Sequence, residues 1–183
     1  MKLLSIAIPC YNSSLYMRKC IDSLLPGGED VEIIIVNDGS ADNTPDIAEE
    51  YRQRFPGIVK VVNKENGGHG SAVNAGIEHA SGLYFKVVDS DDWVSQSAYI
   101  QILDKLRELL QSGNSIDMLV SNFVYEKEGE KRRKVMKYHH ALPQDEIFTW
   151  RDVRHFRVGQ YILMHSVIYR TNLLRDCGLK LPE

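Results

Sequence analysis

The sequence predicts an α/β protein in which a mostly parallel sheet is covered on both faces by helices. In the first half of the 183-residue chain, apolar runs of strand length alternate with segments that repeat apolar residues at helical spacing. The runs are apolar at almost every position, which is typical of strands buried on both faces. Since parallel strands need crossover connections and helices usually supply them, the alternation predicts an α/β sandwich.

The first half should contain four strands and four helices. The expected strands are residues 3–8, 31–36, 59–62 and 83–88. The expected helices are residues 15–25, 44–55, 71–80 and a fourth that starts near Ser95 or Ser97 and runs through Leu110. Pro26-Gly27-Gly28 ends the first helix. Thr44-Pro45-Asp46 starts the second with a cap, a proline at the first helical position and an early acid.

The second half is less regular. Segments 122–125 and 134–138 flank Glu128-Gly129-Glu130-Lys131, a pattern that predicts a β-hairpin. We also expect a short helix at 150–156, a strand at 163–169, and a brief helix capped by Thr171 that ends near Gly178. Because the sequence shows no internal repeat or linker, one domain with a decorated C-terminal part is expected.

Bulk composition argues against several classes of protein. Hydrophobic content of 43% and charged content of 26% are those of an ordinary soluble protein. The net charge of −3 argues against nucleic acid as a partner. Cys10, Cys20 and Cys177 show no CxxC spacing, so neither a disulfide framework nor a zinc site is expected, and the compartment should be reducing. The apolar N-terminal stretch is too short for a signal peptide, and no segment has the length of a membrane span.

Three carboxylates, Asp89, Asp91 and Asp92, follow directly on the apolar run 83–88. Like charges this close repel by about 1 kcal/mol even in water, so the cluster predicts a compensating cation. Oxygen ligands on a short turn suit Mg²⁺ or Mn²⁺. A simpler interpretation makes these residues a turn and an N-cap for the next helix, but three carboxylates are more than a cap needs.

Polar residues also follow the other predicted strands. They are Pro9 to Asn12 after the first strand, Asn37 to Ser40 after the second, and Asn63 to Gly70 after the third. In an open α/β sheet, ligands bind outside the carboxyl ends of the strands, so these loops predict a nucleotide-sized site.

Two of these loops suggest contacts with a nucleotide. Asp38 could accept the imide N–H of a uracil ring, or it could simply hold the turn with Gly39. Gly67, Gly68 and Gly70 could let the backbone approach a phosphate at a helix N-terminus. They fit neither GxGxxG nor the P-loop pattern, so a plain glycine-rich turn is the alternative.

Four motifs, taken in order, resemble the signature of the family 2 glycosyltransferases of the GT-A fold. They are residues 5–12, residues 32–40, Asn66-Gly67-Gly68 with Asn74-Ala75-Gly76 and Ala80-Ser81-Gly82, and Asp89-Ser90-Asp91-Asp92. The resemblance covers about the first hundred residues, and its specificity lies in the order and spacing of the motifs. Residues 165–174 are similar to the segment that precedes the acceptor-side acidic motif in bacterial members.

The resemblance implies a Rossmann-like, mostly parallel sheet with a small C-terminal hairpin and acceptor-side extension. Residues 1–112 would form the half that binds the nucleotide-sugar donor. Residues 113–183 would form the acceptor-side part of the same domain, incomplete at its C-terminus. The implied reaction is the inverting, metal-dependent transfer of a sugar from a nucleoside diphosphate, usually UDP, to a glycan or lipid-linked acceptor.

The resemblance also assigns residues to the donor site. Pro9, Tyr11 and Asp38 would hold the base and ribose, with Asn12 and Gly68 also binding substrate. Asp89, Asp91 and Asp92 would share the ribose contact and the metal, and Asp91 and Asp92 are the expected ligands of Mg²⁺ or Mn²⁺. Three further candidates for ligand contact are Lys64, His69 and His165.

The general base is expected in an acidic motif beyond Glu183, so the sequence identifies no catalytic residue. This chain is therefore expected to bind donor but to transfer sugar poorly. The resemblance further suggests a cytoplasmic enzyme at the inner face of a membrane. The basic run Lys131-Arg132-Arg133-Lys134 is either a solvated hairpin turn or a contact for anionic headgroups.

Two other functions remain open from the sequence. One is a nucleotide-sugar binding module without catalysis. The other is a nucleotidyltransferase, which also uses acidic clusters and metal on an α/β sheet. That class usually has a glycine-rich, basic N-terminal loop for a triphosphate, and residues 9–12 offer none.

Overall fold

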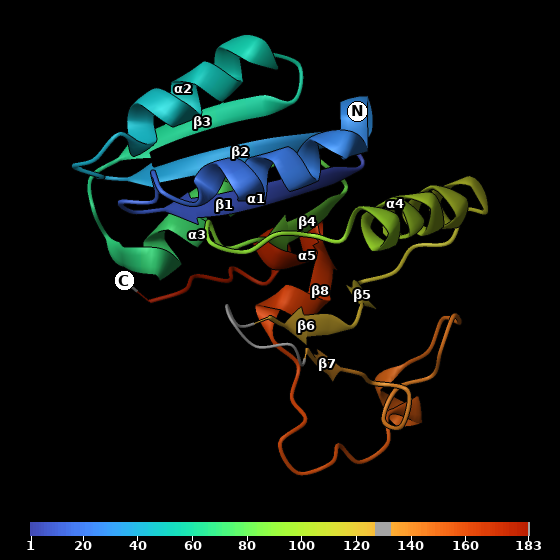
Figure 1. Cartoon of the computed structure of the whole chain (residues 1–183). Coiled ribbons are helices and arrows are strands. Elements are labelled where there is room, and N and C mark those ends of the chain that lie inside the picture. Colours follow the sequence, from blue (N-terminus) through green and yellow to red (C-terminus); the bar gives the residue numbers. More distant parts are fainter. Residues whose placement is uncertain (127–132, 183) are drawn as a thin grey trace.

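The structure is a computed structural model that describes residues 1–126 and 133–182. Six strands form one sheet in the order β3-β2-β1-β4-β8-β5 (Figure 1). The strands are β1 (Leu4–Cys10), β2 (Val31–Asp38), β3 (Val59–Lys64), β4 (Tyr84–Val87), β5 (Met118–Val120) and β8 (Val167–Arg170). Strands β1 to β4 pair in parallel, whereas β8 is antiparallel to both β4 and β5. The predicted α/β fold with a mostly parallel sheet is confirmed.

Helices cover both faces of this sheet. They are α1 (Met17–Leu24), α2 (Thr44–Arg54), α3 (Gly68–His79), α4 (Gln96–Gln111) and α5 (Thr171–Asp176), with 3-10 turns η1 (Leu25–Asp30), η2 (Trp150–Asp152) and η3 (Met164–Ser166). One core cluster joins the sheet to α1, α2 and α4, and a second joins it to α3 and α5. Figure 1 shows α1 in front of the sheet and α3 behind it.

Strand β2 shows why the apolar runs predicted buried strands. Ile33 and Ile35 belong to the core cluster under α1, while Ile34 and Val36 belong to the cluster under α3. Successive side chains of a strand point to opposite faces, so a strand covered on both sides is apolar at most positions, and its few polar residues, here Glu32, Asn37 and Asp38, are buried as well. All eight residues of β2 are buried.

The β-hairpin predicted in the second half is present. Strands β6 (Phe123–Tyr125) and β7 (Lys134–Met136) pair antiparallel. The predicted turn at Glu128 to Lys131 lies outside the described residues, as do two residues of the basic run. A small separate core of Met136, Tyr138, Ala141 and Leu142 packs beneath the hairpin. Strand β5 was not predicted, because its three residues at the edge of the sheet are too few for a recognisable pattern.

Two predictions for residues 150–169 were wrong. The expected helix at 150–156 is only the turn η2, because the Arg154 amide donates to the Ala141 carbonyl instead of continuing a helix. The expected strand at 163–169 starts at Val167. It is delayed because the Ser166 hydroxyl donates to the Leu163 carbonyl at 2.7 Å, closing the turn η3.

The predicted cap of the last helix was also wrong. Thr171 is the first residue of α5, and its hydroxyl donates to the Gly82 carbonyl at 2.6 Å. This bond links α5 to the segment that enters β4. Side chains of the Ser, Thr, Asn and Asp type often bond to distant backbone when they are buried, and Thr171 is almost completely buried.

The last described residues pack against α3. The Asn74 side-chain amide donates to the Leu181 carbonyl, and its oxygen accepts the Leu181 amide, both at 2.9 Å. Figure 1 shows this end of the chain beside the first turn of α3. The motif Asn74-Ala75-Gly76 therefore serves packing: Asn74 holds the 181–182 segment, and Gly76 lies against Ala7 of β1. Among the described residues, no helix is both long and apolar enough to span a bilayer.

Candidate functional site

The predicted site residues gather at one edge of the sheet. Strands β1 to β4 run in parallel, so their carboxyl ends and the loops that follow lie on the same side. Pro9 is buried within β1, whereas Tyr11 just after it is 57% exposed. Asp38 ends β2, Gly68 begins α3, and the acidic loop, residues 89–92, follows β4.

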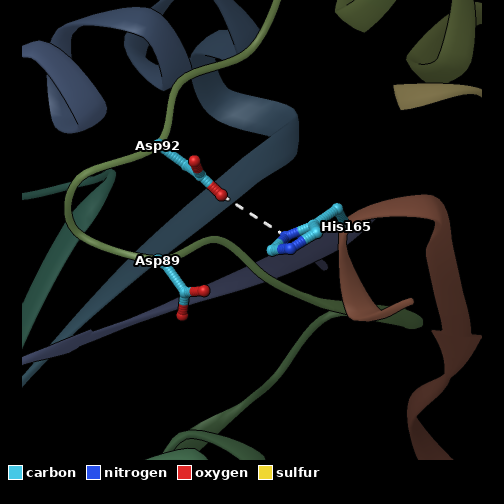
Figure 2. A group of neighbouring side chains, drawn as sticks. All are labelled: Asp89, Asp92 and His165. Atoms are coloured by element: carbon cyan, nitrogen blue, oxygen red, sulfur yellow. Dashed lines mark ion pairs between the residues drawn. The ribbon is translucent and has the colours of Figure 1, made fainter. Parts of the chain in front are cut away.

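Two residues of the acidic loop face a histidine from the second half of the chain. One ligand atom each from Asp89, Asp92 and His165 lie within 4.8 Å of one another. Figure 2 shows the three side chains converging, with His165 carried by the turn η3 and a dashed line joining it to Asp92. His165 Nδ1 lies 3.3 Å from Asp92 Oδ2. These side chains are partly open to solvent, so a ligand can reach them.

A second histidine contacts the same loop. His69, in the first turn of α3, lies with Nε2 2.9 Å from Asp89 Oδ1. This hydrogen bond raises the pKa of His69. Burial raises the pKa of Asp92, with His165 opposing and the nearby charges of Asp89 and Asp91 adding to the effect. The loop thus concentrates negative charge, with His69 beside Asp89 and His165 beside Asp92.

The acidic loop is fixed against the start of the chain. Ser90 and Ser13 share a hydroxyl hydrogen bond of 2.8 Å. The Cys20 thiol of α1 donates to the Asp89 carbonyl at 3.4 Å. Lys19 places its ammonium 3.0 Å from the centre of the Trp93 ring. The N-cap residue of helix α4 is Ser95, so none of Asp89, Asp91 and Asp92 caps this helix.

Asp38 organises the glycine loop. Its carboxylate is buried and accepts the amides of Gly67 at 3.1 Å and Gly68 at 2.9 Å. Lys64, its register partner across β2 and β3, donates to it at 2.6 Å. A carboxylate on the free amides of a helix start stabilises that helix, which explains why α3 begins at Gly68 and not at the predicted Ser71.

Asn12 links the loops after β1 and β2. It has a positive φ of 51°, a conformation that asparagine tolerates better than most residues. Its side-chain oxygen accepts the Ala41 amide at 2.9 Å, and its own amide donates to Ser40 Oγ at 3.0 Å. These bonds hold the two loops side by side.

The candidate metal ligands that lie together are not the same set as those expected from the sequence, which were Asp91 and Asp92. Asp91 is exposed and lies outside the group of Asp89, Asp92 and His165 in the described part of the chain. His165 was only a candidate for ligand contact, because its approach depends on β8 inserting antiparallel beside β4. The one signal for it was a histidine near the start of the strand predicted at 163–169.

A comparison of the chain with models of protein families identifies its family. The model described as Glycosyl transferase family 2 matches residues 5–172. The chain belongs to glycosyl transferase family 2.

Curated relatives resemble the chain over different lengths. EpsJ of Bacillus subtilis, described as an uncharacterized glycosyltransferase, is 32% identical over 99% of this chain and 53% of its own length. The minor teichoic acid biosynthesis protein GgaB, also from Bacillus subtilis, is 36% identical over 63% of this chain and 13% of its own length. The chain therefore spans about half the length of EpsJ and a smaller part of GgaB.

Solved structures with a similar sequence support the same fold. Residues 1–349 of S. aureus TarS match all of this chain with a TM-score of 0.74 and 26% identity, over 50% of that structure. The same part of TarS in complex with UDP-GlcNAc matches with a TM-score of 0.72 and 27% identity, over 49% of that structure.

Proposed function

We propose that this family 2 domain binds a UDP-sugar with a divalent cation and serves the inverting transfer of the sugar to a glycan or lipid-linked acceptor. The observation that carries the proposal is the convergence of Asp89, Asp92 and His165 at the carboxyl edge of the sheet, beside the loop that Asp38 holds. The match to TarS in complex with UDP-GlcNAc supports UDP as the nucleotide.

The base and ribose would bind between the first two loops and the acidic loop. Tyr11 offers apolar surface, with its exposed ring free to pack on a base, whereas Pro9, buried in β1, would contribute through its backbone. Asp38 would accept the uracil imide through Oδ2, since each carboxylate oxygen can accept two bonds and Oδ2 accepts only the Gly68 amide, whereas Oδ1 already accepts Gly67 and Lys64. Asn12 would keep the loops after β1 and β2 in place beside the base, and Gly68 would let a phosphate approach the start of α3.

The donor set fits Mg²⁺ or Mn²⁺. Two carboxylates and one imidazole supply an incomplete shell, which leaves positions for diphosphate oxygens and water. The imidazole makes Mn²⁺ the better candidate, since Mn²⁺ stands above Mg²⁺ in affinity for nitrogen ligands while still accepting carboxylates. Asp92 and Asp89 would be ligands, and Asp91 would contribute through water or to the ribose.

The chemistry requires stabilisation of a leaving diphosphate and activation of an acceptor hydroxyl. A bound divalent cation supplies Lewis-acid stabilisation of the leaving group. The residues of this chain would orient the donor so that its anomeric carbon faces the acceptor side, residues 113–183. An inverting displacement also needs a general base on the face opposite the leaving group, to deprotonate the acceptor hydroxyl.

Two features bear on the acceptor and the site of action. The likeness to GgaB, named for minor teichoic acid biosynthesis, supports a glycan or lipid-linked acceptor. A cytoplasmic position at the inner face of a membrane would bring such an acceptor to the domain, with peripheral membrane association through basic residues such as Arg133 and Lys134.

The proposal is tested by thermal shift of the purified chain with a panel of nucleotides, with and without Mn²⁺. Stabilisation by UDP above UTP, and only with Mn²⁺, is the expected result. Stronger stabilisation by UTP would favour a nucleotidyltransferase. Lack of response to every nucleotide would leave an interaction domain as the better description. UDP binding without acceptor-dependent UDP release in the complete protein would indicate a noncatalytic binding module.

A further inference from the structure

Lys86 holds the turn that carries His165. It is the third residue of β4, and its ammonium donates to the His165 carbonyl at 2.8 Å. It also lies 3.4 Å from the carbonyls of Met164 and Val167. The three carbonyls belong to η3 and to the first residue of β8. The Lys86 side chain therefore contacts the backbone of His165 and the backbone on both sides of it.

The ammonium of Lys86 carries a positive charge into a poorly solvated position. Burial lowers its pKa to about 8, although the charges of Asp92 and Asp89 oppose the change. Among the described residues, no carboxylate lies within ion-pairing distance of it. Lys86 is only partly exposed, and a largely buried cation costs several kcal/mol unless it is well hydrogen-bonded. A methionine of similar length would fill the space without this cost.

Other contacts hold the same turn from outside β4, and one of them reaches its carbonyls, because the Ser121 amide donates to the Ser166 carbonyl at 2.7 Å. The Ser166 hydroxyl accepts the Leu163 amide at 3.2 Å and bonds to the Tyr138 hydroxyl at 3.0 Å. The Phe123 ring packs 5.5 Å from the His165 ring, centre to centre. Lys86 is thus the contact that ties the turn to β4, the strand that leads into the acidic loop.

We propose that Lys86 is a positioning residue that sets the His165 imidazole beside Asp89 and Asp92 and so completes a three-donor site for the divalent cation. The inference rests on the proposed metal-dependent binding of a UDP-sugar. It adds a residue that touches neither the cation nor the nucleotide. Groups that orient metal ligands in this way typically change metal affinity by about 10- to 100-fold when removed.

Charge and position predict opposite results when Lys86 is replaced. If Lys86 acted only as a nearby positive charge, removing it would strengthen binding of Mn²⁺ to the carboxylates. If Lys86 acts by positioning His165, removing it weakens binding. The sign of the change in Mn²⁺ affinity therefore separates the two roles.

The test measures free Mn²⁺ by electron paramagnetic resonance during titration of the protein in saturating UDP. Lys86→Met should weaken Mn²⁺ binding at least tenfold. The matched control Lys105→Met, on the exposed face of α4, should bind Mn²⁺ as the wild type does. Tighter or unchanged Mn²⁺ binding in Lys86→Met would overturn the positioning role.

A double-mutant cycle checks that Lys86 acts through His165. In the His165→Ala background, Lys86→Met should cause less than a twofold further loss, because the group that it positions is gone. Additive losses would overturn the inference, since they would mean that Lys86 supports the site independently of His165. Should Lys86→Met lose its native circular dichroism spectrum, Lys86→Gln replaces it in the cycle, with the same two outcomes.

The wild-type titration separates this inference from the proposed function. If the wild type binds no Mn²⁺ in the presence of UDP, the proposed function fails and the role of Lys86 fails with it. If the wild type binds Mn²⁺ and the cycle is additive, the proposed function stands and only the role of Lys86 is overturned.

Discussion

His165 Nδ1 lies 3.3 Å from Asp92 Oδ2, although the two residues belong to opposite halves of the chain. Strand β8 brings them together by pairing antiparallel with β4, the strand that leads into the acidic loop. The second half of the chain therefore completes the donor set of the candidate metal site. The site is a property of the whole domain and not of the acidic motif alone.

Replacement of His165 should weaken the cation site without unfolding the domain. His165→Ala removes a nitrogen donor from a partly exposed position, so we expect Mn²⁺ affinity in the presence of UDP to fall about tenfold or more. Calorimetric titration measures the change. His139→Ala, on an exposed histidine outside the group of Asp89, Asp92 and His165, is the matched control and should bind normally. Equal affinities in His165→Ala and the control would remove His165 from the metal site.

Asp38→Asn separates base recognition from loop support. If Asp38 accepts the uracil imide, the variant should weaken UDP binding more than binding of inorganic diphosphate, since a charged hydrogen bond contributes roughly 1.5 to 3 kcal/mol. Competition calorimetry measures both affinities. Equal losses would show that Asp38 acts through Gly67 and Gly68, whose amides it holds, and not on the base.

Much of the fold could be predicted because its signals are local. The apolar runs of β1 and β2 and the Thr44-Pro45-Asp46 helix start are determined by neighbours in the sequence. The errors fall where distant contacts decide the local structure. The Arg154 amide bonds to Ala141, and the Thr171 hydroxyl bonds to Gly82, so neither follows its local pattern.

The candidate site was only partly predictable for the same reason. Asp38 and the acidic loop were recognisable because each follows a buried strand. The bond between Asp38 and Lys64 depends on the register of β2 and β3, and the approach of His165 depends on the order of strands in the sheet. Lys86 was not predicted, because a single lysine in a strand carries no signal of its partners.

Buried Glu32 should make stability depend on pH in the acid range. Burial alone would raise its pKa, but bonds from Lys60, Ser5 and Ser81 outweigh this effect and lower the pKa from 4.5 to about 2. A carboxylate with a lowered folded-state pKa stabilises the fold above its unfolded pKa, and this contribution is lost as the pH falls. The loss is on the order of 3 kcal/mol between about pH 4.5 and pH 2.

Urea denaturation at several pH values measures this contribution. The wild type should lose stability as the pH falls from 5 to about 2.5. Glu32→Gln should start less stable at pH 7 and show a shallower decline. Parallel pH profiles for the two proteins would mean that another carboxylate causes the acid sensitivity.

Gly76 is required for the contact between α3 and the sheet. A Cβ at this position would lie 2.5 Å from the Cβ of Ala7, which the central strand β1 holds in place. We therefore expect Gly76→Val to destabilise the domain by at least about 1 kcal/mol, the usual cost of overpacking a core. Urea midpoints measure the change, with Glu78→Ala on the exposed side of α3 as control. Stability equal to that of the control would mean that α3 can shift away from β1 without cost.

The central claim is that Asp89, Asp92 and His165 hold a divalent cation beside a UDP that Asp38 recognises. A crystal structure of this chain with UDP and Mn²⁺, using anomalous scattering to locate the manganese, tests it most directly. The account predicts one manganese ion bonded to Asp92, His165 and the diphosphate, with the uracil imide on Asp38. Manganese away from these side chains, or a uracil ring that does not reach Asp38, would contradict it.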